Sequence, residues 1–364
     1  MATLHASADT VERQIKTILA SWGMPQDLVA RTAKVMVETD LMGVDSHGIS
    51  MLMTYEGKLK EGRLDLTAAP KIVNETPATA TVDAGANLGH PASVFAMSLA
   101  VDKAEAMGVG AVTVNNSHHF GAAGYYANIA AERGAFGMVA STARGITVVP
   151  TGAAVPVLGT NPLAFAAPAK RNRPWLLDMA TSTVAVGKVR VFGYRNEPLP
   201  DGWVSDGDGK PVKDGTEAYN MMVGSDSGGL TPIGGTRELS SYKGYGLGVL
   251  AQVLGGALAG GNFVPVDKPR EAADAPENIG HFFLALSPQA FRPTGAFEDH
   301  IDTVVDTLHA TPAADPAQPV LVAGDPEAAK RAERLEAGIP IPQSLSTQLR
   351  DVCDRAGVDF ILGG

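Results

Sequence analysis

Cysteine is nearly absent from this sequence, since Cys353 is the only one among 364 residues. One thiol excludes an intrachain disulfide framework and any metal site that is built from several cysteines. This composition is typical of a reducing compartment, and we expect a cytoplasmic protein. The first residues, Met1 to His5, lack the basic and apolar segments of a secretory signal, which favours the same expectation.

Basic residues are in deficit. Lysine and arginine total 29 against 39 aspartates and glutamates, which gives a formal net charge of −10. The densest basic run, Lys170-Arg171-Asn172-Arg173, is too short to follow a phosphate backbone and is predicted to be the solvated tip of a strand pair. We therefore expect no nucleic-acid partner.

Uninterrupted apolar runs are missing as well. The uncharged stretch 244–263 is rich in glycine and fits poorly as a membrane span, which needs about 20 strongly apolar residues. We therefore expect no membrane association and interpret the stretch as a buried, close-packed helix. Its small residues Gly248, Gly255 and Ala259 would let another backbone approach, either inside the core or across a subunit interface.

The length of the chain predicts two domains, because one hydrophobic core rarely serves more than about 250 to 300 residues. Apolar periodicity predicts three helices within residues 9–62 and three more at 297–309, 326–337 and 342–356. The middle of the chain alternates short β-rich runs with helices. We predict an α/β fold, with a helical domain from residues 1–75 and 290–364 and a mixed-sheet domain from residues 76–289.

The middle region contains a pattern of strand, polar loop, helix and strand at residues 109–114, 115–119, 122–133 and 136–141. Loops at the ends of strands commonly carry ligand-binding groups in α/β folds, so 115–119 is a candidate for function. Further strands are predicted at 71–74, 79–83, 163–168, 175–179 and 282–286. The Gly, Asp and Ser-rich segment 195–240 is predicted to form long loops capable of closing over a ligand.

The most informative motif is Val44-Asp45-Ser46-His47-Gly48-Ile49, which separates two predicted helices at 27–41 and 49–61. It places the titratable His47 at a helix start, where its side chain is able to face a cleft. Imidazole exchanges protons near neutral pH, so the motif suggests an enzyme. Taken alone, His47 is equally compatible with a packed core residue, and Ser46 with a helix cap.

Two other enzyme classes have weak support. Metal hydrolysis would require Asp45, His47, His90, His118 and His119 to converge, but no His-Glu-x-x-His pair is present. We predict no bound metal. A serine hydrolase would need a Gly-x-Ser-x-Gly elbow, which the sequence lacks.

A phosphate-binding loop is suggested by the glycines of 243–248, but their spacing does not match Gly-x-Gly-x-x-Gly and no strand precedes them. A dinucleotide would have to bind in another way. Backbone donors at 241–244 and 159–162 are candidate phosphate contacts, with Lys243 beside them.

Five blocks occur together in one order over residues 45–247: Asp45-Ser46-His47-Gly48-Ile49, Asn116 to Tyr125, Gly159-Thr160-Asn161-Pro162-Leu163-Ala164, Leu177 to Ser182 and Tyr242 to Leu247. In combination they closely resemble the type 2 malate/L-lactate dehydrogenase family. That family includes ureidoglycolate and sulfolactate dehydrogenases and diketogulonate and cyclic-imine reductases. The resemblance extends over nearly the whole chain and implies a homodimer that uses NADH or NADPH on a non-Rossmann fold.

The resemblance also implies a reaction, in which a hydride passes between nicotinamide and C2 of a 2-hydroxy or 2-oxo acid. His47 matches the proton donor or acceptor, Ser46 would orient it, and His119 is the second catalytic candidate. His118 is then a structural neighbour. The implied cofactor contacts are Thr160, Asn161, Pro162, Asp178, Met179, Ala180, Thr181, Ser182, Lys243, Gly244, Gly324 and Asp325.

One departure from the family pattern concerns substrate binding. Many members carry arginine three residues after the glycine of Ser-His-Gly, where it can hold a carboxylate in a bidentate manner, but this chain has Met51. Arg144, which follows the predicted strand 136–141, is the candidate replacement for binding a small carboxylic acid. Two alternative functions remain: the reduction of cyclic imino acids, and NAD(P)H binding by a catalytically altered protein. The sequence does not determine whether the cofactor is NADH or NADPH.

Overall fold

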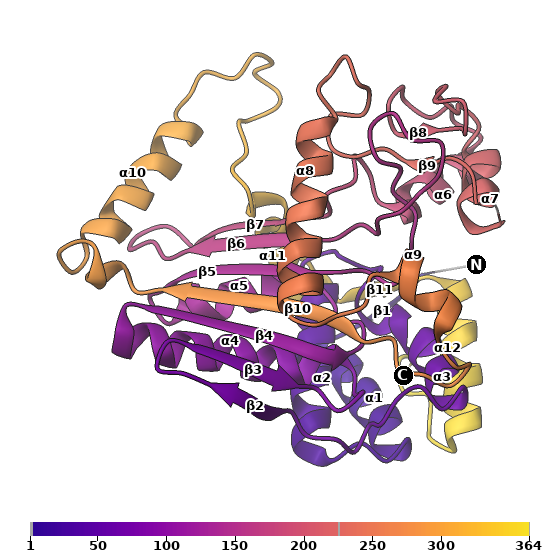
Figure 1. Ribbon diagram of the computed structural model, residues 1–364, viewed down its shortest axis with the longest axis horizontal. Coiled ribbons are helices and arrows are strands. Elements are labelled where there is room, and N and C mark those ends of the chain that lie inside the picture. Colours follow the sequence, from indigo (N-terminus) through magenta and orange to yellow (C-terminus); the bar gives the residue numbers. More distant parts are fainter. Residues whose placement is uncertain (1–2, 225, 364) are drawn as a thin grey trace.

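Helices from both ends of the chain pack together in the computed structural model, which describes residues 3–224 and 226–363. A short two-stranded sheet joins the two ends, because β1 (Leu4–Ala6) pairs antiparallel with β11 (Ile339–Ile341). The helices lie side by side (Figure 1), and apolar side chains such as Ile15, Leu28 and Val352 form one core between them. These helices are α1 (Ala8–Ser21), α2 (Gln26–Leu41), α3 (Leu52–Lys60) and α12 (Gln343–Ala356).

A seven-stranded mixed sheet forms the centre of the molecule, with the order β2-β3-β4-β10-β5-β6-β7. Strands β3 and β4 run parallel, and the other neighbouring pairs run antiparallel. The predicted mixed α/β class is therefore confirmed. The strands are β2 (Lys71–Glu75), β3 (Thr79–Asp83), β4 (Val109–Ser117), β5 (Phe136–Ser141), β6 (Leu163–Ala167), β7 (Trp175–Met179) and β10 (Ile279–Leu286).

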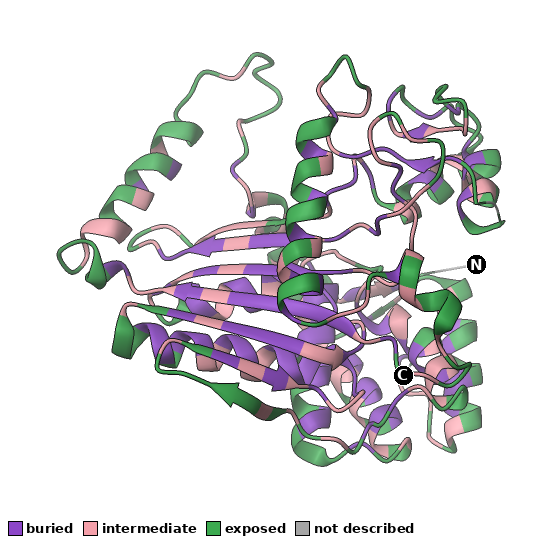
Figure 2. Ribbon diagram, in the orientation of Figure 1, coloured by how far each residue is buried: buried purple, intermediate pink, exposed green. Residues whose placement is uncertain are grey.

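The two faces of the sheet are covered by different elements, as alternation along β10 shows. Phe283 and Ala285 belong to the core shared with α4 (Gly89–Met107) and α5 (Ala123–Glu132). Phe282 and Leu284 face the other way, toward the segment that follows α8 (Tyr242–Ala251). Buried residues consequently concentrate in the sheet and its flanking helices (Figure 2).

The glycine-rich stretch 244–263 differs from the single buried helix that we predicted. It consists of α8 followed by a π-helix, η2 (Gln252–Leu258), and its large side chains Leu250, Val253 and Leu258 are exposed. Small residues face the sheet instead: a β-carbon on Gly255 would lie 2.7 Å from the carbonyl oxygen of Gly280. The predicted close approach at Gly255 is confirmed. Because small residues face the sheet and large apolar residues face outward, one apolar side of this stretch is exposed.

Residues 195–240, which we predicted as long loops, contain short elements around a third core. Its members include Val148, Val189, Leu199 and Leu230. The prediction was wrong because glycine and aspartate interrupt this segment so often that its apolar residues show no period. The elements of this region are α6 (Val186–Arg195), α7 (Gly215–Gly224), β8 (Val204–Ser205) and β9 (Gly229–Leu230).

Helix α10 (Ala296–His309) lies apart from the terminal helices, against the turn between β6 and β7 (Figure 1). The carboxylate of Asp302 accepts hydrogen bonds from the backbone N–H groups of Lys170, Arg171 and Asn172 at 2.9 to 3.2 Å. The backbone of the basic run is therefore tied to α10, while the side chains of Lys170 and Arg171 are exposed, as predicted for a solvated tip. The predicted domain boundaries at 75, 76, 289 and 290 stay a prediction.

The remaining short elements connect these units, and α11 (Asp325–Ala337) packs against α2. Strand β4 extends to Ser117, so the predicted loop 115–119 is shorter than expected. In the ranges that the structure describes, no helix is both long and apolar enough to cross a membrane. The short elements are η1 (Ile49–Met51), α9 (Val264–Asp267), η3 (Lys268–Arg270) and η4 (Pro288–Ala290).

Candidate active site

The turn that carries His47 is held by Asp40 on one side and by Arg334 on the other. The carboxylate of Asp40, at the end of α2, accepts a hydrogen bond from the backbone N–H of Ile49 at 2.8 Å. From α11, Arg334 forms an ion pair with Asp45 and also donates to the backbone carbonyl of Asp40. Burial raises the pKa of Asp40 to about 8, despite the hydrogen bond from Ile49, and the nearby Asp45 contributes to the rise.

His47 emerges from this turn into a cavity. Its Nδ1 lies 2.7 Å from the hydroxyl oxygen of Ser46, and its ring centroid lies 5.1 Å from that of His119. Burial lowers the pKa of His47 below its ordinary value. The imidazole is therefore neutral at pH 7, and the contact with Ser46 leaves Nε2 as the nitrogen available for proton exchange.

His119 is supported by Tyr55, a residue that the sequence analysis did not identify. The Tyr55 hydroxyl lies 2.8 Å from Nδ1 of His119 and 3.5 Å from Nε2 of His90. Burial raises the pKa of Tyr55 well above its ordinary value, so the hydroxyl keeps its proton. Burial, followed by the neighbouring His47 and His90, lowers the pKa of His119, which is also neutral. Donation by Tyr55 to Nδ1 places the His119 proton on Nε2.

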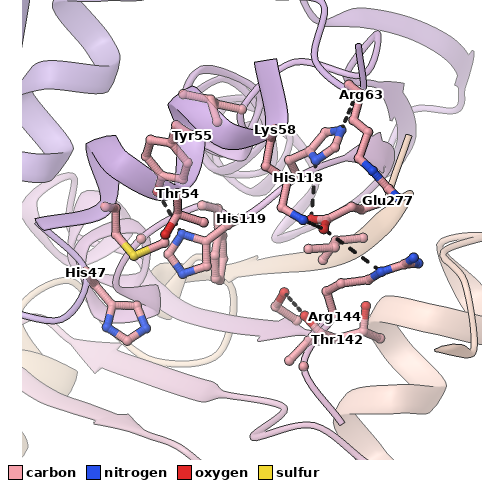
Figure 3. Close-up of a pocket in the computed structure, with 18 of the residues that line it drawn as sticks. His47, Thr54, Tyr55, Lys58, Arg63, His118, His119, Thr142, Arg144 and Glu277 are labelled. Carbon is pink, nitrogen blue, oxygen red and sulfur yellow. Dashed lines mark hydrogen bonds and ion pairs between the residues drawn. The ribbon is translucent and has the colours of Figure 1, made fainter. Parts of the chain in front are cut away.

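The opposite end of the same cavity is ionic (Figure 3). Glu277 forms ion pairs with Lys58 and with His118, whose Nδ1 lies 3.3 Å from the carboxylate. Although burial alone would raise it, hydrogen bonds from His118 and Lys58 lower the pKa of Glu277 to about 2. The other ring nitrogen of His118 lies 2.9 Å from the carbonyl oxygen of Arg63, as suits a structural residue.

Arg144, the predicted substrate ligand, lies at this ionic end. Its two terminal nitrogens donate to the two carboxylate oxygens of Glu271 at 2.9 and 2.6 Å. Its Nε lies 3.9 Å from Glu277. Asn262 donates a further hydrogen bond to Glu271 at 2.7 Å, which holds the partner of Arg144 in place.

These groups line one cavity of about 540 Å³ between the terminal helices and the sheet. His47 and His119 lie toward one end, and Lys58, Arg144 and Glu277 lie toward the other (Figure 3). Met51 is part of the wall. A concave space whose walls are mostly apolar and carry a few directed polar groups suits a small acid. No cluster of three or more potential metal ligands occurs among residues 3–224 and 226–363.

A second cavity of about 420 Å³ adjoins the first and shares His47, Gly121, Thr160 and Pro162 with it. The N-terminal residues of α5 and α6 line it. No side chain caps the start of α6, where Val186 and Gly187 lie on the wall. Such a helix start offers backbone N–H donors and the positive end of the helix dipole to an anion.

The predicted cofactor residues divide into three groups. Thr160, Pro162, Asp178, Met179 and Ala180 line the second cavity. Asn161, Thr181 and Ser182 form the second group, which lies behind this wall. The buried Asn161 accepts a hydrogen bond from the N–H of Ala143 and donates one to the carbonyl of Gly248. Thr181 donates to the carbonyl of Thr160. Buried Ser182 donates to the carbonyl of Val184. These side chains support the loop that forms the wall.

The third group lies elsewhere. Lys243 and Gly244 begin α8 and are not among the residues that line the two cavities; a β-carbon on Gly244 would collide with the backbone of Ile233. Gly324 lines a neighbouring cavity. Asp325 forms ion pairs with Arg173 and with His309, the latter at 2.8 Å.

Tyr55 and Lys58 were missed although the sequence contained a signal. Together with Met51 they are spaced four and three residues apart, which places all three on one helical face. A helical face that begins four residues after His47 lies next to the predicted site, and this spacing was the signal that the sequence analysis did not use. No local pattern marked Glu277 and Glu271, because Lys58 and Arg144, with which they form ion pairs, lie more than 120 residues away in the sequence.

Comparisons with known proteins identify the kind of enzyme to which this cavity belongs. Residues 6–350 match the malate/L-lactate dehydrogenase family. Malate dehydrogenase from Pyrococcus abyssi is 34% identical over 342 residues, which cover 94% of this chain and 92% of that protein. Together with the fold, these matches define an oxidoreductase of the dehydrogenase class. The chain belongs to the malate/L-lactate dehydrogenase family, as its motifs predicted.

Solved structures agree with this assignment. Malate dehydrogenase from Entamoeba histolytica superposes with a TM-score of 0.92 at 29% identity, covering 99% of both chains. The delta1-piperideine-2-carboxylate reductase from Pseudomonas syringae has a TM-score of 0.81 at 28% identity and covers 96% of this chain and 99% of its own. The same fold thus occurs in proteins named for two different reactions.

Proposed function

We propose that this enzyme interconverts a 2-hydroxy acid and the corresponding 2-oxo acid with NADH or NADPH as the hydride carrier. One observation supports this most strongly. The ring centroids of the neutral His47 and His119 lie 5.1 Å apart, and His47 lines both the first cavity, with its ionic end, and the second cavity, which contains an uncapped helix start. An acid bound in the first cavity would lie next to a dinucleotide bound in the second cavity.

The second cavity has a donor set that suits a dinucleotide. Gly187 lies at the start of α6, and a β-carbon built on it would have no atom within 4 Å. The start of α6 therefore leaves room for a pyrophosphate near backbone N–H groups. Thr160, Pro162 and the stretch from Asp178 to Ala180 would enclose the nicotinamide half. When bound, the nicotinamide supplies or accepts the hydride.

His47 carries out the proton transfer in this proposal. In the oxidation direction the neutral imidazole accepts the proton of the substrate hydroxyl at Nε2, while Ser46 holds Nδ1. In the reduction direction the imidazolium returns that proton to the new alkoxide. Because burial lowers its pKa, the imidazolium is a stronger acid than a solvated histidine. His119, oriented by Tyr55, donates a hydrogen bond from Nε2 to the same oxygen.

The substrate carboxylate is assigned to the ionic end of the first cavity. Arg144, Lys58 and Arg63 provide positive charge there, and Met51 provides none at the position where the family resemblance implies an arginine. Because Glu271 occupies both terminal nitrogens of Arg144, carboxylate binding requires Arg144 to share or exchange this partner.

A cyclic imino acid is the second candidate substrate. Met51 makes the wall beside His47 apolar, which suits a ring better than a second charge. The similarity to the reductase from Pseudomonas syringae supports the same reading. In that reaction His47 would exchange its proton with the ring nitrogen.

A homodimer is part of the proposal. Leu250, Val253 and Leu258, on the outer side of α8 and η2, are 40 to 60% exposed, and Leu247 lies beside them at 37%. A contiguous apolar stripe of this kind is typical of a surface that is covered in the assembled protein. A second copy of the chain is the occupant that the family resemblance implies.

The test is a screen of cofactor oxidation at 340 nm. The purified protein is mixed with NADH or NADPH and with pyruvate, oxaloacetate, 2-oxoglutarate, sulfopyruvate or piperideine-2-carboxylate. Turnover that falls by about 10²-fold or more in His47→Gln supports the proposal, since general acid–base catalysis has that scale. Cofactor binding without turnover would favour a catalytically altered NAD(P)H-binding protein, and no binding of either cofactor would exclude the proposal.

A further inference from the structure

A third cavity adjoins the second cavity, and His47 is not among the residues that line it. It has a volume of about 520 Å³ and shares Met42, Leu176 and Glu327 with the second cavity. Helices α2, α5 and α11 form its walls together with the start of β7. The three cavities therefore adjoin one another in a row, the groove, which begins at the ionic end beside Arg144 and ends beside Arg173 and Arg331.

Glu327, in the first turn of α11, is the carboxylate at the junction of the second and third cavities. Among the described residues its carboxylate forms no ion pair and no side-chain hydrogen bond. The cations around it are already engaged: Arg331 and Lys34 pair with Glu38 at 2.8 Å, and Arg173 pairs with Asp325. Glu327 is thus an acceptor that the protein itself leaves available.

We infer that Glu327 binds the adenosine ribose of the cofactor through its 2′ and 3′ hydroxyls and thereby selects NADH over NADPH. This inference rests on the proposed function. With the nicotinamide beside His47 and the pyrophosphate at the start of α6, the adenosine half continues along the groove to the junction where Glu327 lies. A carboxylate accepts hydrogen bonds from two neighbouring hydroxyls, and these charge-assisted bonds are strong.

The charges at this end of the groove oppose a 2′-phosphate. Such a group removes one hydroxyl donor and adds up to two negative charges beside Glu327. The four carboxylates in and around the junction outnumber its three cations, and each cation already has a partner. These carboxylates are Glu38, Glu132, Asp325 and Glu327. A phosphate would therefore meet repulsion and no free guanidinium.

Asp178 is a second carboxylate on the wall of the cavity that Glu327 also lines. It lies on the wall of the second cavity and accepts a hydrogen bond from the N–H of Gly124 at 2.7 Å, so the start of α5 is already neutralised. Desolvation raises the pKa of Asp178 to about 6, and the charge of Glu327 contributes to the rise. The pyrophosphate is consequently directed to α6, and Glu327 lies beyond it in the groove.

The experiment is calorimetric titration of the purified full-length chain with NADH and with NADPH. The variants are Glu327→Gln, Glu327→Lys and, as the matched control on the same helix, Glu336→Gln, whose side chain is exposed and lines none of the three cavities. Thermal melting of each variant establishes that it is folded.

Wild-type protein is expected to bind NADH at least about tenfold more tightly than NADPH, the scale of one hydrogen bond to a charged group. Glu327→Gln should lose most of this preference through weaker NADH binding, and Glu327→Lys should favour NADPH. Glu336→Gln should match the wild type. Equal binding of both cofactors by wild type, or equal weakening of both by Glu327→Gln, overturns the inference but leaves the dehydrogenase proposal intact. Failure to bind either cofactor overturns both.

Discussion

The backbone of Gly48 lies so close to the carboxylate of Asp40 that a β-carbon at position 48 would be 1.8 Å from Oδ1 of Asp40. Asp40 has no freedom to withdraw, because it is 2% exposed and bound to the N–H of Ile49. The glycine after His47 is therefore required by the group that holds the catalytic turn. The close contact with Asp40 is what excludes a β-carbon at this position.

Gly48→Ala should consequently displace the turn that carries His47. We expect kcat to fall by about tenfold or more, because misplacement of a catalytic group by about 1 Å has large effects on rate. Gly57→Ala is the control, since a β-carbon there meets nothing within 4 Å and alanine favours a helix. Kinetics and thermal melting of both variants provide the check; a Gly48→Ala enzyme with unchanged kcat contradicts this account.

Asp40→Asn should change how stability depends on pH. The ordinary pKa of 3.8 applies to the unfolded chain, whereas burial raises the pKa of Asp40 to about 8 in the folded protein. Between these values the unfolded state is ionised while the folded state keeps its proton, so this group lowers stability progressively as pH rises, by up to ~1.4 kcal/mol per pH unit.

Asparagine retains an acceptor for the N–H of Ile49 and does not titrate. The variant should therefore gain stability relative to wild type as pH rises from 5 to 8, as measured by urea unfolding at several pH values. A difference between the two proteins that stays constant over this range would show that Asp40 is ionised in the folded state.

Tyr55→Phe should impair catalysis without affecting cofactor binding. The substitution removes the hydroxyl that lies 2.8 Å from Nδ1 of His119 and leaves the ring in its buried position. We expect kcat to fall by about 10-fold to 10²-fold, because His119 loses the partner that sets its tautomer. Steady-state kinetics and NADH titration provide the measurement, and Tyr194→Phe, at an exposed site, is the control. An equal loss of NADH affinity would instead indicate a structural role.

Arg144→Ala should raise KM for acid substrates steeply while cofactor affinity stays nearly unchanged, because Arg144 lies in the first cavity, outside the walls of the second. Glu271→Gln provides the complementary test. It weakens the bidentate pair that occupies Arg144 and should lower KM for the same substrates. If neither substitution changes KM, the substrate carboxylate binds elsewhere in the cavity.

Local features of the chain were predictable from the sequence. Strands 79–83, 136–141 and 175–179 have the predicted bounds, because short apolar runs bounded by turn residues are a short-range property of the sequence. The junction at His47 was equally visible, since a glycine and a polar motif interrupt two apolar periodicities. The ordered set of motifs identified the family before any contact between them was known.

Only the tertiary structure decided which distant groups meet. Arg144 pairs with Glu271, Glu277 with His118 and Arg334 with Asp45, across separations of 127, 159 and 289 residues. Such pairings depend on how helices and strands pack, and no local pattern records them. The exposed side of α8 and the third core were hidden for the same reason: which face of a segment is buried depends on the elements packed against it.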